Sequence, residues 1–171
     1  FAAAVAQLHG EWAQWRRWWL ALWLALVTHP LLDALTVYGT QLALPFSNHP
    51  FGVGSVFIID PLVTVPWAAG TAWALAARGS AAGLRANAVG LALGCAYLAF
   101  GFGAQQHVRQ QAIASLQAQG VQAERVLVTP AAFSVLLWRV VAVDADSYRE
   151  GYRSLFDAPG PIAFDRFDRG A

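Results

Sequence analysis

The chain has 171 residues, of which 57% are hydrophobic and 12% are charged, whereas a typical soluble domain has about 25% charged residues. Together with a mean hydropathy of +0.45, this balance indicates a membrane protein with lipid as a partner. A formal net charge of +1 excludes a strongly basic nucleic-acid-binding protein, and a single cysteine, Cys95, excludes a disulfide framework and a cysteine metal cluster.

Three stretches are long and apolar enough to cross a bilayer, which takes about 20 helical residues. They cover residues 18–38, 56–77 and 87–104. Tryptophans cluster at the start of the first stretch, where their amphipathic rings favour the membrane interface. Glycine and alanine in the third stretch predict close contact with another helix. Since the chain has no methionine, even at position 1, we expect further residues upstream in the complete protein.

The arginines predict an orientation. Arg16 and Arg17 precede the first stretch, and Arg78 and Arg85 lie between the second and the third, whereas residues 39–55 contain none. Because basic residues favour the cytoplasmic side, we expect residues 39–55 outside the cytoplasm. The part of the chain that follows the third stretch is then also extracytoplasmic.

The character of the sequence changes at Gln105. Residues 105–119 have the pattern of an amphipathic helix that ends at Gly120. Residues 124–167 contain β-branched and aromatic runs separated by turn residues, which predict three or four strands. The sequence therefore predicts an all-α membrane bundle of about three transmembrane helices over residues 1–104, with a small C-terminal α+β domain over residues 105–171.

Three ionisable residues lie within the predicted spans. His29 and Asp33 are four residues apart, so on a helix they project from one face, roughly 6 Å apart. Asp60 precedes Pro61 near the outer end of the second stretch, and we expect it at a level similar to that of the pair. An imidazole with carboxylates suits zinc, with manganese or iron as alternatives.

Two other interpretations of these residues stay open. Polar groups inside a membrane also hold helices together or carry protons and ions. The competing hypothesis is therefore a non-enzymatic integral membrane protein in which His29 and Asp33 serve helix packing or proton handling.

The remaining candidates carry weaker signals. His49 lies in the predicted outer loop and is the candidate catalytic contact to substrate or leaving group, although an exposed loop histidine has the same pattern. Arg139 alternates with apolar neighbours, which favours an edge charge or an ion-pair partner. His9 and His107 stand alone and are assigned no role.

Two motifs carry a resemblance to a known family: THPLLDALTVYGTQLALPFSNHPF at residues 28–51 and SVFIIDPLVTVP at residues 55–66. From about Arg16 the chain resembles the bacterial membrane-bound metal-dependent hydrolases. This YdjM-like group is also described as LexA-binding, inner-membrane-associated hydrolases. The later segment TPAAFSVLLWRVVAVDADSYREGYRSLFD, residues 129–157, is similar to the C-terminal extension of many members.

The resemblance implies a multi-pass protein of the bacterial inner membrane with a metal-dependent hydrolase site. It places metal ligands at His29, Asp33 and Asp60, and it implies an acidic motif and an H-R-G-x-[ST]-H-S motif upstream, neither of which is in this sequence. The family pattern is also similar to zinc-dependent phospholipase C proteins, which implies a phosphoester or lipid ester substrate. The predicted extracytoplasmic placement argues against the C-terminal domain as the contact for a LexA-type repressor.

Overall fold

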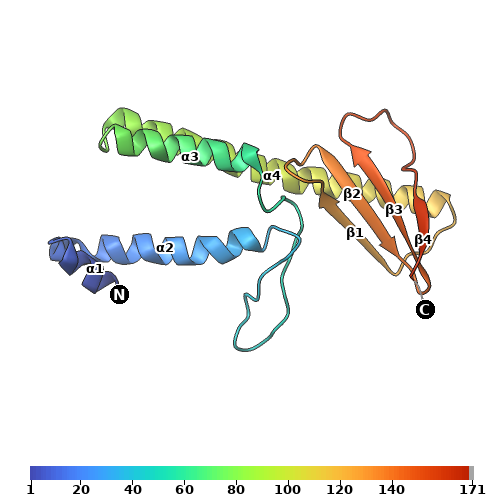
Figure 1. Cartoon of the computed structure of the whole chain (residues 1–171), viewed down its shortest axis with the longest axis horizontal. Coiled ribbons are helices and arrows are strands. Elements are labelled where there is room, and N and C mark those ends of the chain that lie inside the picture. The colour runs from blue at the N-terminus through green and yellow to red at the C-terminus, as the bar shows by residue number, and fades with distance from the viewer. Residues whose placement is uncertain (170–171) are drawn as a thin grey trace. The chain divides into compact units, whose positions relative to one another are not determined.

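The computed structural model describes residues 1–169, and the chain divides into two compact units, one of residues 1–53 and one that begins at Gly54. The first unit starts with α1 (Ala2–Leu8), the 3-10 helix η1 (Trp12–Gln14) and α2 (Trp15–Asp33) (Figure 1). The His9 ring stacks on Trp18 with 5.0 Å between centroids, and the Trp18 indole donates to the Glu11 carboxylate at 3.0 Å. These contacts hold α1 against the start of α2.

A closed loop follows α2 in the first unit. Thr40 and Phe51 exchange two backbone hydrogen bonds of 2.9 Å each, and Val53 N donates to Ala34 O at 2.8 Å. Gly39 has φ +69°, and a Cβ there would lie 2.8 Å from Phe51 O, so only glycine suits this crossing. The loop therefore leaves α2 and returns to its end, with His49 on the exposed excursion between the paired residues.

The second unit begins with a helical hairpin. The Asp60 side chain caps α3 (Pro61–Ala76), and the Ser80 hydroxyl caps α4 (Ala81–Ala118) by accepting from Gly83 N at 3.2 Å. Asp60 and Ser80 are favoured capping residues, and Pro61 suits the first helical position because its missing N–H has no partner there. Arg78 and Gly79, both with positive φ, form the turn between the helices.

Glycines bring α3 and α4 close together. A Cβ at Gly90 would overlap the carbonyl oxygen of Pro66, and a Cβ at Gly94 would overlap the Trp67 indole. The Thr71 hydroxyl also donates to the Asn87 side chain at 3.3 Å across the pair. The prediction that glycine permits close helix contact in this segment is confirmed.

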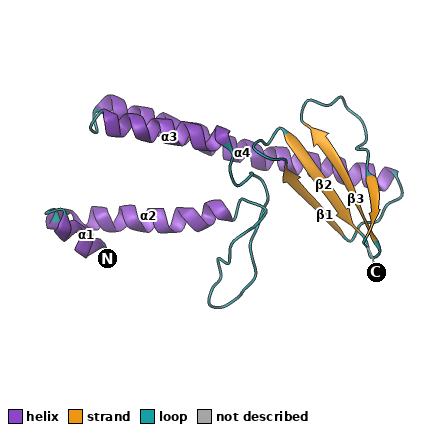
Figure 2. Ribbon diagram, in the orientation of Figure 1, coloured by secondary structure: helices purple, strands orange, loops and turns teal. Residues whose placement is uncertain are grey.

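Four antiparallel strands complete the second unit in the spatial order β1-β2-β3-β4 (Figure 2). They are β1 (Arg125–Pro130), β2 (Leu137–Val143), β3 (Ser147–Ser154) and β4 (Asp165–Asp168). The last turns of α4 pack on one face of this sheet. The buried residues of that contact are Ala104, Val108, Ala112, Val128, Val135, Trp138, Val140 and Ile162.

The predicted C-terminal sheet is therefore confirmed, but the predicted spans need correction. Among residues 1–169, only α4 is long and apolar enough to cross a membrane by length and composition, where the sequence analysis expects three such helices. The second stretch loses residues 56–60, because α3 begins at Pro61 and has 16 residues. The first ends at Asp33 rather than at residue 38, and the third joins the predicted amphipathic helix to form the 38 residues of α4.

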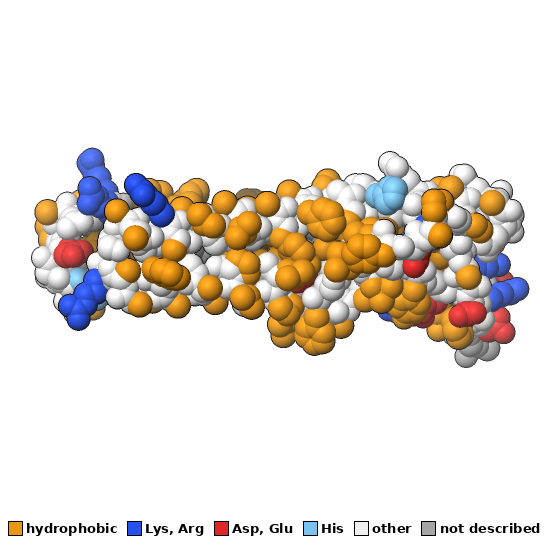
Figure 3. Space-filling view, turned by 90° about the horizontal axis from the view of Figure 1, so that it is seen from above, with side chains coloured by type: hydrophobic (Ala, Val, Ile, Leu, Met, Phe, Trp, Pro, Cys, Tyr) orange, Lys and Arg blue, Asp and Glu red, His pale blue; other side chains and the backbone are white. Residues whose placement is uncertain are grey.

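Apolar side chains cover the outside of the helices as well as the core. None of the described residues of α2 is buried, and Leu26 in this helix is 73% exposed. In the second unit, Trp73 and Leu75 at the end of α3 are 64% and 74% exposed. Figure 3 shows hydrophobic side chains spread along the helical surface, with charged side chains gathered toward the ends. Such a surface is suited to lipid rather than water.

Candidate functional site

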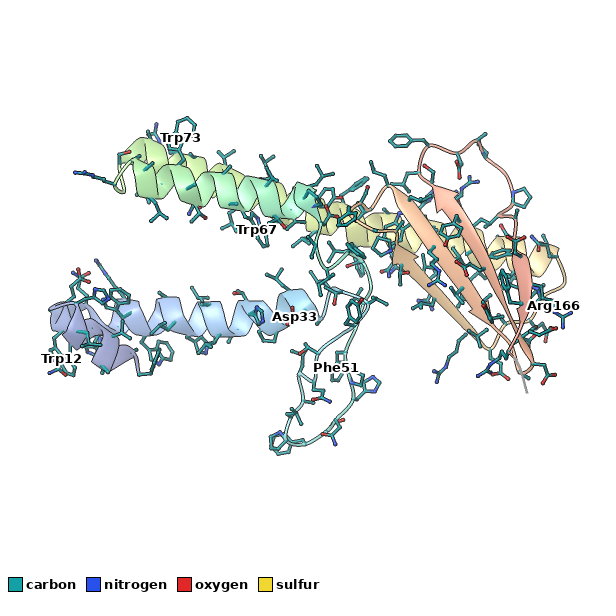
Figure 4. All side chains as sticks on the ribbon, in the orientation of Figure 1. Trp12, Asp33, Phe51, Trp67, Trp73 and Arg166 are labelled. Carbon is teal, nitrogen blue, oxygen red and sulfur yellow. The ribbon has the colours of Figure 1, made fainter. Side chains whose placement is uncertain are left out.

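His29 and Asp33 lie on the last turns of α2 and meet on one face. The His29 Nε2 atom is 3.4 Å from Asp33 Oδ2, and their side chains are 80% and 46% exposed. The predicted i, i+4 pairing is therefore confirmed, and both side chains are accessible to a ligand. Figure 4 shows Asp33 near the end of this helix.

The helix α2 ends directly after this pair, at Asp33. Pro30 lies inside α2 and cannot donate a backbone hydrogen bond. The Thr28 hydroxyl donates to Leu24 O and the Thr36 hydroxyl to Asp33 O, both at 2.7 Å. Thr36, which follows Asp33 by three residues, thus bonds to the backbone where the helix ends. The pair occupies the terminal turns of a helix that ends in the closed loop.

Asp60 has a different environment, in the second unit. It is 2% exposed, its Oδ1 accepts from Leu62 N at 3.0 Å, and its Oδ2 accepts from the Tyr97 hydroxyl at 3.0 Å. The Tyr97 oxygen in turn accepts from Val135 N at 3.3 Å, just before β2. Asp60 thus joins the start of α3, the middle of α4 and the chain that leads into the sheet.

Tyr97 is a polar partner that the sequence analysis missed. Its only sequence signal is a hydroxyl within an otherwise apolar segment, and neither the spacing nor a motif links it to Asp60. The contact joins residues 37 positions apart, so it exists only because α3 and α4 fold back on each other.

His49 lies on the exposed part of the closed loop. Its backbone N–H donates to the Ser47 hydroxyl at 3.2 Å, and its ring meets Phe51 edge-on with 5.1 Å between centroids. The loop thus presents the imidazole beside an aromatic ring, which Figure 4 labels. Its predicted contact with a substrate stays a prediction.

The donor chemistry of the described residues fits a metal ion in part. His29 and Asp33 supply one imidazole nitrogen and one carboxylate, whereas catalytic zinc sites usually have three protein ligands. Within residues 1–169, no three His, Cys, Asp or Glu side chains form a cluster that could hold a metal ion. Because His29 and Asp33 belong to the first unit and Asp60 to the second, the predicted set of three ligands remains a prediction.

Arg139 is an ion-pair partner, as the alternation of its strand predicts. Its Nε donates to Glu150 Oε1 at 2.8 Å and its NH2 group to Oε2 at 3.1 Å, and the Tyr152 hydroxyl donates to Oε1 at 2.7 Å. The hydrogen bonds from Arg139 and then Tyr152 lower the pKa of Glu150 from 4.5 to about 2. This network lies on the sheet face opposite α4 and holds the carboxylate charged.

Comparisons with known proteins identify the family of the chain. A family model described as YdjM inner membrane protein matches residues 1–108, which is more than half of the chain and includes the motifs around His29, His49 and Asp60. No curated protein and no solved structure matches the chain.

Proposed function

We propose that this chain, which belongs to the YdjM inner membrane protein family, is a metal-dependent hydrolase of a phosphoester or lipid ester, with His29 and Asp33 among its metal ligands. The observation that carries the proposal is the meeting of His29 Nε2 and Asp33 Oδ2 at 3.4 Å on one accessible helix face. An exposed pair of this kind adds little to stability, so a functional role accounts for it better than a structural one.

The helix supports the pair in a way that suits ligand binding. Both side chains project from consecutive turns of α2, so their donor atoms stay close without any long-range contact. A metal ion bound there would lower the pKa of a water molecule to about 7 and polarise the ester. The His29 imidazole would supply a ring nitrogen to the ion, and the Asp33 carboxylate would offset part of its positive charge.

Asp60 and His49 have supporting roles in this proposal. Asp60 remains a candidate third ligand, although both of its carboxylate oxygens already accept hydrogen bonds. His49 would contact the substrate or its leaving group from the closed loop. Its exposure favours access, and the nearby Phe51 ring offers an apolar surface for the organic part of an ester.

We also propose a multi-pass arrangement in which α2 and α3 lie in lipid together with α4. The exposed leucines and tryptophans of α2 and α3 support it, because a water-exposed surface of this composition would aggregate. α3 has 16 residues and would extend about 24 Å, close to the ~30 Å of the hydrocarbon core. The arginines before α2 and around the turn between α3 and α4 favour the cytoplasmic side.

Hydrolysis by the purified protein tests the proposed activity. We expect detergent-solubilised wild type to cleave a chromogenic phosphodiester or a fluorescent phospholipid, and a chelator to abolish the activity until zinc is restored. His29→Ala and Asp33→Ala should each lower the rate on the order of 100-fold or more, since even groups that only support metal ligands contribute about 10–100-fold. Asp168→Ala, which removes an exposed carboxylate of β4, is the matched control and should keep full activity.

One observation favours the competing non-enzymatic role for part of the polar set. Asp60 is buried and serves as a helix cap, which is a packing function. If wild type loaded with zinc, manganese or iron cleaves neither substrate, while His29→Ala and Asp33→Ala lower its unfolding temperature, the hydrolase proposal fails and packing explains all three residues.

A further inference from the structure

A buried arginine in the second unit lacks a counter-charge. Arg153 on β3 is 7% exposed, and its NH2 group donates to Ala158 O at 3.0 Å. No carboxylate among residues 1–169 lies within ion-pair distance of it. A guanidinium has five N–H donors, so a single carbonyl acceptor leaves most of its hydrogen-bonding capacity unused.

Three other arginines of the sheet form ion pairs. Arg139 pairs with Glu150, Arg149 with Asp144 and Arg166 with Asp168. These pairs show that carboxylates of the sheet pair with guanidinium groups less buried than Arg153, whereas within residues 1–169 this most buried arginine has no such partner. Burying a cation without a partner is costly, which points to an anion that is bound in the working protein.

The geometry supplies a space for that anion. Arg153 lines a pocket of about 270 Å³ between α4 and the segment that follows β3. His107 and Gln111 of α4 form another wall, with 3.0 Å between His107 Nε2 and Gln111 Nε2. Asp157 also lines the pocket, but its Oδ2 accepts from Ser154 N at 2.8 Å.

The pocket lies close to the lipid-suited part of α4. The last large, exposed apolar side chain before it is Phe102, at 50% exposure. His107 follows five residues later, or about 7.5 Å further along the helix axis. The pocket therefore lies near the level at which lipid headgroups would surround α4.

We propose that this pocket binds a phosphate group, held by the guanidinium of Arg153 and the imidazole of His107. Arginine binds phosphate oxygens in pairs through its planar fork of donors, and the imidazole adds a donor from the α4 wall. The source is either a phospholipid headgroup or a soluble phosphate ester, since both carry the same group. This site lies within the second unit and does not depend on the proposed hydrolase site at His29 and Asp33.

Thermal unfolding of the full chain in dodecyl maltoside tests the proposal. Potassium phosphate should raise the unfolding temperature of wild type by on the order of a few degrees over potassium chloride of equal ionic strength. Arg153→Met should lose this shift. Arg139→Met is the matched control, since it removes an arginine that Glu150 already neutralises, and it should keep the shift.

A second variant keeps the test decisive if Arg153→Met does not fold. His107 is exposed, so His107→Ala should fold and should bind phosphate more weakly than wild type. In chloride alone, Arg153→Met should unfold at or above the wild-type temperature, because it removes an unpaired buried charge.

Lipid binding distinguishes the two sources. Short-chain phosphatidic acid is compared with diacylglycerol of the same chain length, using native mass spectrometry of wild type and Arg153→Met. Retention of phosphatidic acid by wild type alone supports a headgroup site, and a phosphate shift without retention supports a soluble ester. Equal responses of wild type and Arg153→Met, or no response to either probe, would overturn the proposal, whatever the outcome of the hydrolysis assay.

Discussion

Arg139 and Arg153 lie on neighbouring strands of the sheet, but their guanidinium groups have different surroundings. Arg139 projects from the sheet face opposite α4 and pairs with Glu150 on the adjacent strand. Arg153 lies on the α4 side and lines the pocket, and no carboxylate of residues 1–169 is within ion-pair distance of it. Because side chains alternate along a strand, the position along β2 or β3 decides which of the two environments an arginine enters.

The ion pair between Arg139 and Glu150, on the sheet face opposite α4, predicts that the stability of the fold depends on pH. The pKa of Glu150 is lowered to about 2 by Arg139 and Tyr152, so its interactions stabilise the folded state above the unfolded pKa of 4.5. That contribution is lost as the pH falls through about 2. Arg139→Gln should raise the pKa of Glu150 toward 4.5 and shift this loss to higher pH.

Carboxyl chemical shifts from an NMR titration would measure the pKa directly, with Arg166→Gln as a control that leaves Glu150 paired. A Glu150 pKa that stays near 2 in Arg139→Gln would contradict the assignment of the shift to this pair.

At the scale of elements, the contact between α3 and α4 depends on glycines of α4 that face the other helix, and Gly90 and Gly94 leave the least room there for a side chain. At Gly90 the obstacle to a side chain is the backbone carbonyl of Pro66, which cannot move aside as a side chain can. Gly103 on the same helix differs, because a Cβ at this position would have no neighbouring atom within 4 Å.

Gly90 and Gly103 should therefore respond differently to the same substitution. We expect Gly90→Ala to destabilise the hairpin by on the order of 1–3 kcal/mol through overpacking. Gly103→Ala should be neutral or stabilising by up to about 1 kcal/mol, because alanine favours the helix. Unfolding temperatures in detergent would compare the two variants, and equal effects of the two substitutions would contradict the role given to close packing at Gly90.

The helix boundaries show how much of these elements the sequence can predict. Hydropathy locates α2, α3 and α4 but not their ends. An average over apolar residues does not distinguish Asp60 and Pro61, which are typical of a helix start, from the apolar residues around them. The change to polar residues after Ala104 suggests a new helix, but polarity alone does not break a helix, and no glycine or proline interrupts residues 104–118 of α4.

Some contacts of the candidate site can be predicted from the sequence and others cannot. The contact between His29 and Asp33 is local and follows from their spacing on a helix. The Tyr97 contact of Asp60 and the pocket of Arg153 depend on segments far apart in the chain, which no local pattern reveals. The sequence thus predicts the helical pair but not the partners that tertiary packing supplies.

At the scale of the whole molecule, the arginines predict which parts of the chain face the cytoplasm. Cys95 is the only cysteine in the sequence, so Cys95→Ala gives a background for single-cysteine labelling. In that background, Asn48→Cys and Asp146→Cys should react with a membrane-impermeant maleimide in intact spheroplasts, and Ser80→Cys only after lysis.

The three labelled positions report on the loop after α2, on the turn between α3 and α4, and on the sheet, so together they test the multi-pass proposal. Protection of the Asp146→Cys variant in intact spheroplasts, with reaction after lysis, would place the sheet in the cytoplasm. The proposed number of crossings would then be wrong.

His29 and Asp33 are proposed to hold a metal ion, and the metal content of the purified protein tests this most directly. Elemental mass spectrometry would be applied to detergent-purified wild type, His29→Ala, Asp33→Ala and the control Asp168→Ala. We expect stoichiometric zinc, manganese or iron in wild type and control, and its loss in both variants with the helical content unchanged. A well-folded wild type without metal after incubation with all three ions, or equal metal content in all four proteins, would contradict the claim.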